Sequence, residues 1–216
     1  MSVRSLARRL MCAAACAATA CGSPSGPASP STGASARTIV VLGDSLAVSP
    51  SRAEGFPAVL QARLGAAHPG WTVDNQGVSG DTTADGLRRV DAALKTDTAI
   101  LVVELGANDV LGAVAVPSIE SNLSTIIERA QSRGIRVLLC GLEIPPINTP
   151  AYAPAFNQMF PRLATKYHVA LVPSLLEGVA FNPDLNGPDG VHPNAAGAVH
   201  VADTVWVYLE SLVTGG

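Results

Sequence analysis

The chain has 216 residues, of which 48% are hydrophobic and 14% are charged, and its formal net charge is −3. This length and composition indicate a globular protein that buries one sizeable core. The mild acidity gives no electrostatic reason to expect a nucleic-acid partner, so DNA- and RNA-binding functions are disfavoured.

The first 21 residues have the pattern of an export signal. A positive region comes first, formed by Arg4, Arg8 and Arg9. An alanine-rich apolar stretch follows over residues 10–20 and is shorter than the roughly 20 residues of a membrane-spanning helix. Small residues around Cys21 resemble the bacterial lipobox, although Ala18 stands where leucine is usual. We therefore expect a signal peptide that ends at Cys21 and a lipid on Cys21, with a plain secretory signal as the alternative.

Residues 22–36 contain only Gly, Ser, Pro, Ala and Thr. Such a tract cannot bury enough apolar surface to offset its ordering entropy, so it predicts a flexible linker. We expect a cell-envelope lipoprotein on the extracytoplasmic face, or otherwise a secreted or periplasmic protein. Membrane contact is expected only through the lipid anchor, and the chain is expected to be a monomer.

Strand-like and helix-like runs alternate from Arg37 onward. In chain order we predict strand 38–42, helix 55–67, strand 71–75, helix 87–94, strand 98–105, helix 118–133, strand 136–140, helix 154–167, strand 170–173 and helix 194–212. This alternation predicts one α/β domain over residues 37–214, with a five-stranded parallel sheet and helices on both faces. Active sites in such sheets form at the carboxyl ends of the strands.

Ser45 follows the first predicted strand in the tight turn Gly43-Asp44-Ser45-Leu46. A serine hydroxyl is a poor nucleophile unless a neighbouring base takes its proton. A turn at a strand end can expose that hydroxyl and aim the backbone N–H of Ser45 at a substrate oxygen. The alternative role of Ser45 is that of a helix N-cap, which serine fills well.

His192 is the candidate base, because histidine exchanges protons near neutral pH. Asp189 lies three residues earlier in a loop rich in glycine and proline. This spacing lets one turn present both side chains, with the carboxylate orienting the imidazole. A turn-capping aspartate beside a surface histidine is the alternative.

Two further residues could stabilise a negatively charged oxygen. Gly80 can offer its backbone N–H, and Asn108 can offer its side-chain NH₂; both come just after predicted strands. The alternatives are a simple turn glycine and an asparagine that bonds its own backbone. Together with the N–H of Ser45, these groups would form an oxyanion hole.

Other reactive residues are weaker candidates. Cys140 is the only cysteine of the predicted domain, so no intrachain disulfide can form there, and its apolar strand predicts a buried, inert thiol. Ser79 comes near a Gly-x-Ser-x-Gly motif but is out of register. Nothing in the sequence indicates a metal site or a cofactor, and we expect Asp44, Asp81 and Asp109 to hold loops.

These motifs closely resemble those of the SGNH (GDSL) hydrolase superfamily, and in particular its bacterial arylesterase, thioesterase and lysophospholipase subgroup. The four residues that name the superfamily match Ser45, Gly80, Asn108 and His192. The resemblance covers residues 38–212 and implies a flavodoxin-like three-layer α/β/α sandwich. It also implies a Ser-His-Asp triad completed by Asp189. The subgroup usually has two glycines where this chain has Gly106-Ala107, and the residues after Leu46 also differ.

The sequence therefore predicts a serine esterase that cleaves acyl or aryl esters through an acyl-enzyme intermediate, with thioesters as a further candidate substrate. The substrate would be a small-molecule or lipid ester, and no cofactor is expected. The alternatives are a lysophospholipase, a carbohydrate O-deacetylase and an exported binding module without catalysis. The natural substrate and its acyl chain length are not readable from the sequence.

Overall fold

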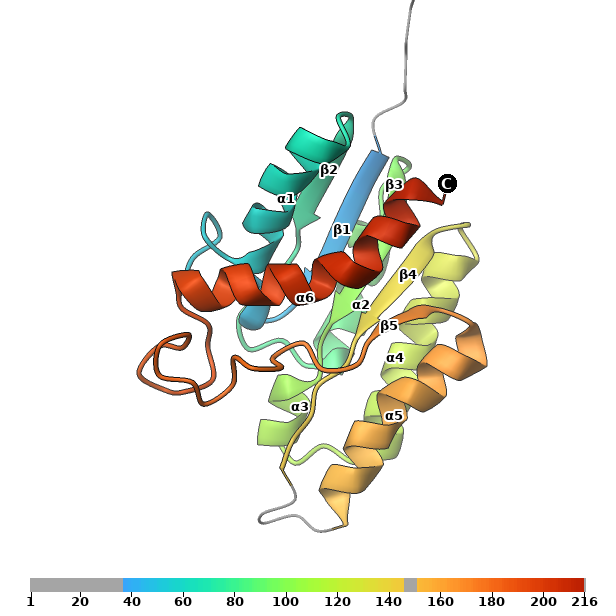
Figure 1. The fold of residues 1–216 in the computed structure, drawn as a ribbon. Coiled ribbons are helices and arrows are strands. Elements are labelled where there is room, and N and C mark those ends of the chain that lie inside the picture. Colours follow the sequence, from blue (N-terminus) through green and yellow to red (C-terminus); the bar gives the residue numbers. More distant parts are fainter. Residues whose placement is uncertain (1–36, 146–150, 216) are drawn as a thin grey trace, which may run out of the picture. The chain divides into compact units, whose positions relative to one another are not determined.

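The computed structural model of the chain describes residues 37–145 and 151–215. Within this part, one parallel sheet is formed by β1 (Arg37–Gly43), β2 (Trp71–Asn75), β3 (Thr98–Glu104), β4 (Arg136–Cys140) and β5 (Ala170–Val172). The strand order is β2-β1-β3-β4-β5, so the chain moves first to one edge of the sheet and then to the other (Figure 1). The predicted fold class is confirmed.

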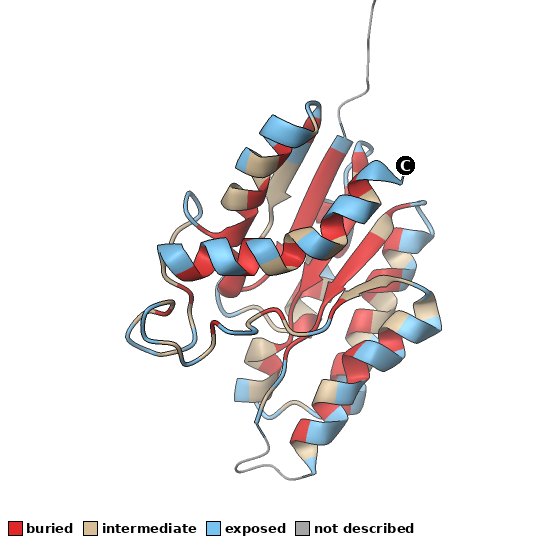
Figure 2. Cartoon of the chain, in the orientation of Figure 1, coloured by how far each residue is buried: buried red, intermediate tan, exposed pale blue. Residues whose placement is uncertain are grey.

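Helices form a layer on each face of the sheet. On one face, α1 (Phe56–Ala67) packs against α6 (Ala195–Thr214); the other face is covered by α2 (Thr83–Ala93), α4 (Val116–Gln131) and α5 (Tyr152–Tyr167) (Figure 1). Figure 2 shows buried strands between helices whose outer faces are exposed. None of the helices in residues 37–145 and 151–215 is both long and apolar enough to cross a membrane.

The expected signal peptide, the lipidation site at Cys21 and the linker over residues 22–36 lie outside the described residues. Their assignment therefore stays a prediction from the sequence.

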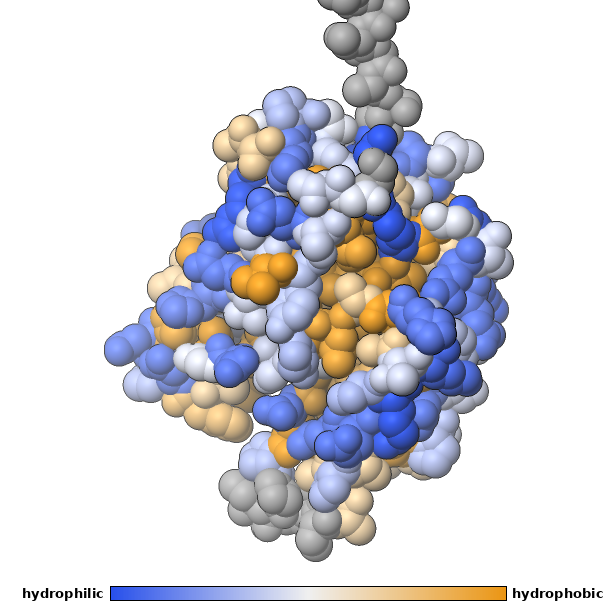
Figure 3. Space-filling model, turned by 45° about the vertical axis from the view of Figure 1, so that its right-hand side comes forward, coloured by the Kyte–Doolittle hydropathy of each residue, from blue (hydrophilic) through white to orange (hydrophobic). Residues whose placement is uncertain are grey.

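The two central strands are apolar on both faces. Ile39–Leu42 in β1 and Ile100–Val103 in β3 have no exposed surface. Since helices cover both faces of the sheet, side chains on either side of the pleat enter the core. Burying each of these side chains contributes about 1.5–3 kcal/mol. Figure 3 shows that charged and polar side chains cover much of one face of the molecule, with apolar side chains left in its middle.

Two short helices at the carboxyl end of the sheet were not predicted. They are the 3-10 helix η1 (Leu46–Val48) and α3 (Ala107–Leu111). Helix α2 begins at Thr83, four residues before the predicted start at position 87. Its start is set by a capping box, in which the Thr82 side chain accepts the N–H of Asp85 and the Asp85 carboxylate accepts the N–H of Thr82.

The start of α6 is packed closely against the loop that precedes it. The side chain of Asn194 caps the helix by accepting the N–H of Gly197 at 3.0 Å. A Cβ atom at Gly197 would collide with the backbone oxygen of Leu185 and lie 3.1 Å from the Cβ of Pro193. Only glycine fits between the helix and this loop.

We expect Gly197→Ala to destabilise the protein, although alanine is the better helix former. The matched control is Gly65→Ala in α1, where nothing lies within 4 Å of the added Cβ. The control should gain about 1 kcal/mol of stability from helix propensity alone. Urea unfolding of both variants checks this. A Gly197→Ala variant as stable as the control would show that the loop moves aside freely.

Candidate active site

Ser45 lies between the end of β1 and the start of η1. Its Oγ is 2.8 Å from Nε2 of His192, which is 147 residues away in the chain. The Ser45 side chain makes no capping hydrogen bond to η1. The hydroxyl therefore faces the imidazole rather than serving as a helix cap.

Asp189 and His192 form one turn, as their spacing predicted. Nδ1 of His192 lies 2.6 Å from Oδ2 of Asp189, while Oδ1 accepts the backbone N–H groups of Val191 and His192, each at 3.0 Å. The positive φ of Gly190, 73°, lets the chain turn back within three residues. The N–H of Val191, the His192 side chain and the His192 N–H lower the pKa of Asp189 to about 2. Its carboxylate is therefore ionised at neutral pH.

The loop between β5 and α6 is pinned on both sides of this turn. The N–H of Gly187 donates to the carbonyl of His192, and the N–H of Phe181 donates to the carbonyl of Gly190, both at 2.8 Å. Asn194 donates its backbone N–H to Leu185 at 2.9 Å. These backbone bonds fix the segments before and after His192, and so they fix the position from which its imidazole extends.

Gly80 lies in a turn in which the N–H of Asp81 donates to the carbonyl of Val78 at 3.1 Å. Its φ is +86°, and no atom lies within 4 Å of the position a Cβ would take. The backbone conformation, rather than a lack of space, is what requires glycine there. Gly77, by contrast, is closely packed, since a Cβ there would lie 2.8 Å from the Cβ of Ala47.

Asn108 lies in the first turn of α3 and reaches two other loops. Its Nδ2 donates to the backbone carbonyl of Asp81 at 2.9 Å and to Oδ2 of Asp44 at 3.1 Å. These bonds are to other loops and not to its own backbone. An amide has two N–H donors, so an oxyanion bound by Asn108 would have to replace one of these acceptors. The positive φ in this motif falls on Gly106, at 126°, while Ala107 is helical and is tolerated.

Beneath the Ser45 turn lies a buried pair of carboxyl groups. Glu104, at the end of β3, is fully buried, and its Oε2 accepts the N–H of Asp44 at 3.1 Å. Burial, reinforced by the nearby Asp44 charge, raises the pKa of Glu104 well above its usual range. Burial also raises the pKa of Asp44 to about 6, against the hydrogen bond from Leu46. Glu104 was not predicted to belong to the site, and the signal for it in the sequence is a single acid at the end of an apolar strand.

The other acids near the site hold loops, as expected. Asp109 accepts the N–H of Thr83 at 2.8 Å and its hydroxyl at 2.6 Å, which joins α3 to the start of α2. Asp44 accepts the N–H of Leu46 at 2.9 Å. Within residues 37–145 and 151–215, no three His, Cys, Asp or Glu side chains are grouped so that they could hold a metal ion.

The two rival nucleophiles lie apart from this arrangement. Cys140 is buried, and burial raises the pKa of its thiol well above the usual range. Ser79 is exposed on the turn that carries Gly80. Among the described side chains, it is the Ser45 hydroxyl that is bonded to a histidine, and this histidine, His192, is in turn bonded to the Asp189 carboxylate.

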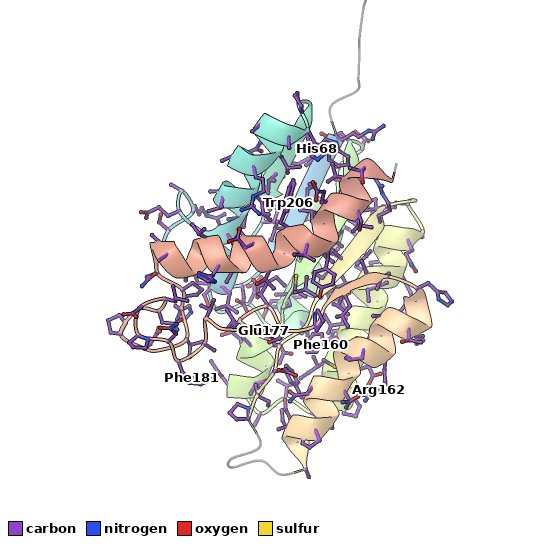
Figure 4. All side chains as sticks on the ribbon, viewed as in Figure 1. His68, Phe160, Arg162, Glu177, Phe181 and Trp206 are labelled. Carbon is purple, nitrogen blue, oxygen red and sulfur yellow. The ribbon has the colours of Figure 1, made fainter. Side chains whose placement is uncertain are left out.

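A largely apolar cavity of about 430 Å³ opens beside His192. Its lining includes Leu46, Val110, Leu111, Ile144, Phe156, Leu176 and Phe181. Leu111 and Phe181 are exposed at 84% and 70%, so the apolar surface extends from the cavity to its rim. Figure 4 shows Phe181 on the loop between β5 and α6. The site can therefore hold an apolar group next to the imidazole.

Comparisons with known proteins show the family to which the chain belongs. Residues 41–199 match the model of the GDSL-like lipase/acylhydrolase family. The chain is 37% identical to Esterase TesA of Pseudomonas aeruginosa, over 83% of this chain and 91% of TesA. It is 32% identical to the Thioesterase 1/protease 1/lysophospholipase L1 of Escherichia coli K12, over 83% of this chain and 86% of that protein. A crystal structure of TesA superimposes with a TM-score of 0.77 at 36% identity, covering 82% of this chain and 99% of the other.

We expect the free energy of unfolding to decrease between pH 4 and pH 7 because of Asp44. The unfolded chain releases this proton at the ordinary pKa of 3.8, whereas the folded protein keeps it up to about pH 6. Folding is therefore disfavoured as pH rises through this window, by about 3 kcal/mol for a shift of this size. Asp44→Asn removes the titration but keeps an acceptor for Leu46.

Urea unfolding of wild type and Asp44→Asn at pH 4 and pH 7 measures this difference. We expect the free energy of unfolding of the variant, minus that of wild type, to be larger at pH 7 than at pH 4. A difference between the two proteins that is the same at both pH values would contradict the burial of an ionisable Asp44.

Proposed function

The chain belongs to the GDSL-like lipase/acylhydrolase family and is an ester-hydrolysing serine esterase, and we propose that Ser45, His192 and Asp189 carry out its reaction. The observation that carries this assignment is the unbroken run of hydrogen bonds from Ser45 through His192 to Asp189, at 2.8 and 2.6 Å. A hydroxyl, an imidazole and an ionised carboxylate in this order are the parts of a triad.

In the proposed reaction, Oγ of Ser45 attacks the ester carbonyl while Nε2 of His192 takes its proton. The Asp189 carboxylate holds the ring and stabilises the imidazolium that forms. Collapse of the tetrahedral intermediate transfers the proton to the departing alkoxide and leaves an acyl group on Ser45. Water then attacks this ester with the same base, which releases the carboxylic acid and restores Ser45.

We assign the oxyanion hole to the backbone N–H groups of Ser45 and Gly80 and the amide of Asn108. The arrangement of the loops supports this assignment, since Asn108 donates to the carbonyl of Asp81, the residue after Gly80. Its second acceptor, Asp44, directly precedes Ser45. All three donors thus belong to segments that are hydrogen-bonded to one another, and each donor typically contributes about 3 kcal/mol.

The cavity beside His192 favours an ester with an apolar acyl group. It is lined mainly by aliphatic and aromatic side chains, and apolar burial is worth about 0.8 kcal/mol per methylene. A lysophospholipid or an acyl thioester fits this lining. Both substrate classes also agree with the name of the Escherichia coli relative. An acetylated carbohydrate, which needs polar partners, fits it poorly.

We further propose that the enzyme is exported and carries a lipid on Cys21, with residues 22–36 as a tether. The support is the sequence pattern: three arginines, an apolar stretch and small residues around Cys21. In the structure β1 begins at Arg37, directly after the proposed tether. Its first residue is at the opposite end of the strand from Ser45.

Ser45→Ala should abolish ester hydrolysis and labelling by a fluorophosphonate probe. Loss of a triad serine costs on the order of 10⁶ in kcat, because the remaining parts of the site have no nucleophile to position. Hydrolysis of p-nitrophenyl esters and gel fluorescence of the labelled protein measure the two effects.

Ser79→Ala is the matched control, since Ser79 is a nearby exposed serine without the imidazole contact. It should keep both activities. Hydrolysis by Ser45→Ala at the wild-type rate would exclude Ser45 as the nucleophile. A wild type that neither hydrolyses esters nor reacts with the probe would indicate a binding module.

An acyl-chain series should show that the cavity holds the acyl group. We expect kcat/KM to rise by up to about fourfold per methylene from the acetyl ester until the cavity is filled. Val110→Trp, which fills part of the cavity, should lower kcat/KM for octanoyl esters and leave acetyl esters nearly unchanged. Assays of p-nitrophenyl esters, octanoyl thioesters and acetylated xylose measure this preference. Best activity on the acetylated sugar would contradict the assignment.

A further inference from the structure

Arg89 on α2 bonds the end of β1 to the loop between β2 and α2, and it does not belong to the triad. Its Nη2 donates to the carbonyl of Gly43 at 2.8 Å, its Nη1 to the carbonyl of Gln76 at 2.6 Å, and its Nε to Oδ2 of Asp81 at 2.6 Å. The Arg89 and Asp81 side chains are only 23% and 14% exposed. This interaction is therefore more than a surface ion pair.

Two of the three acceptors of Arg89 lie within two residues of a proposed oxyanion donor. Gly43 lies two residues before Ser45, and Asp81 directly follows Gly80. The backbone carbonyl of Asp81 in turn accepts the amide of Asn108 at 2.9 Å. One guanidinium thus bonds directly to the two segments next to Ser45 and Gly80, and it is linked to Asn108 through Asp81.

The chemistry at this junction requires arginine. Two carbonyl oxygens and a carboxylate point toward one place, where they would repel each other without a cation among them. A planar guanidinium has five N–H donors and can serve three acceptors at once, and it stays charged. A lysine ammonium places its charge there but cannot match the three directions.

We propose that Arg89 is a positioning residue for the oxyanion hole. It sets the distance between the Ser45 turn and the Gly80–Asp81 turn, and through Asp81 it sets the place of the Asn108 amide. This inference rests on the proposed function. Because oxyanion donors act on the transition state more than on bound substrate, loss of Arg89 should lower kcat and leave KM nearly unchanged.

Arg52 shows how a loop contact without this role should behave. It donates to the carbonyl of Asn75, at the end of β2, at 2.8 Å and to that of Gly77, in the loop that follows β2, at 2.5 Å. It has no hydrogen bond to Gly43 or Asp81. If support of the loop were all that mattered, Arg52 and Arg89 variants would have the same effect on kcat.

The experiment compares Arg89→Lys and Arg89→Gln with Arg52→Gln and with Arg88→Gln, a change at the adjacent exposed arginine. Steady-state hydrolysis of a p-nitrophenyl ester gives kcat and KM. Urea unfolding and circular dichroism verify that each variant is folded. We expect kcat to fall about 10²-fold or more in Arg89→Gln, and less in Arg89→Lys, with KM within threefold of wild type. Arg88→Gln should match wild type, and Arg52→Gln should lose less than tenfold in kcat.

Partial recovery of Arg89→Gln activity by added guanidinium at non-denaturing concentrations would further support the role of Arg89. A folded Arg89→Gln with wild-type kcat, or one that loses no more kcat than Arg52→Gln, would overturn the proposal. If the Arg89 variants do not fold, Asp81→Asn tests the same contact. It should lower kcat about tenfold at unchanged KM, and a wild-type kcat would overturn the proposal. Failure of the proposed function would appear separately, as ester hydrolysis that survives Ser45→Ala.

Discussion

Backbone groups at the carboxyl end of a parallel sheet find no further partners within the sheet, and loops must supply them. The last carbonyl of β1, on Gly43, accepts the N–H of Val78 at 3.0 Å and a guanidinium N–H of Arg89. At the end of β3, the carboxyl of Glu104 accepts the N–H of Asp44. These partners come from segments that follow other strands or belong to other helices. Satisfying the sheet end therefore also fixes the turns around Ser45 in relation to one another.

Burial divides the carboxyl groups of the site into two kinds. Glu104 is enclosed beneath the Ser45 turn, and burial raises its pKa, which favours the neutral carboxyl. Asp189 is about half exposed and accepts two backbone N–H groups, so its lowered pKa keeps it ionised. Only an ionised carboxylate can stabilise an imidazolium. The charge that supports His192 thus lies in the exposed loop before α6. In the core, burying the same charge would be costly.

Particular elements show which predictions local sequence supports. The bounds of β2 and β4 were predicted to the residue, and the turn from Asp189 to His192 was predicted from its three-residue spacing. The short helices η1 and α3 were missed, since three to five residues are too few to show helical periodicity. Arg89 was missed because it follows Arg88 in an amphipathic helix and resembles a solvated surface residue. Its acceptors lie up to 46 residues away.

The sequence by itself determined the alternation of strands and helices, the ends of β2 and β4, and the pairing of Asp189 with His192. These features depend on side-chain pattern and on turn chemistry between near neighbours, which a chain carries locally. Only the tertiary structure decided that His192 faces Ser45, that Glu104 is buried beneath that serine and that Asn108 bonds to Asp44 and Asp81. Burial and hydrogen-bond partners arise when distant segments pack together, and no local pattern specifies them.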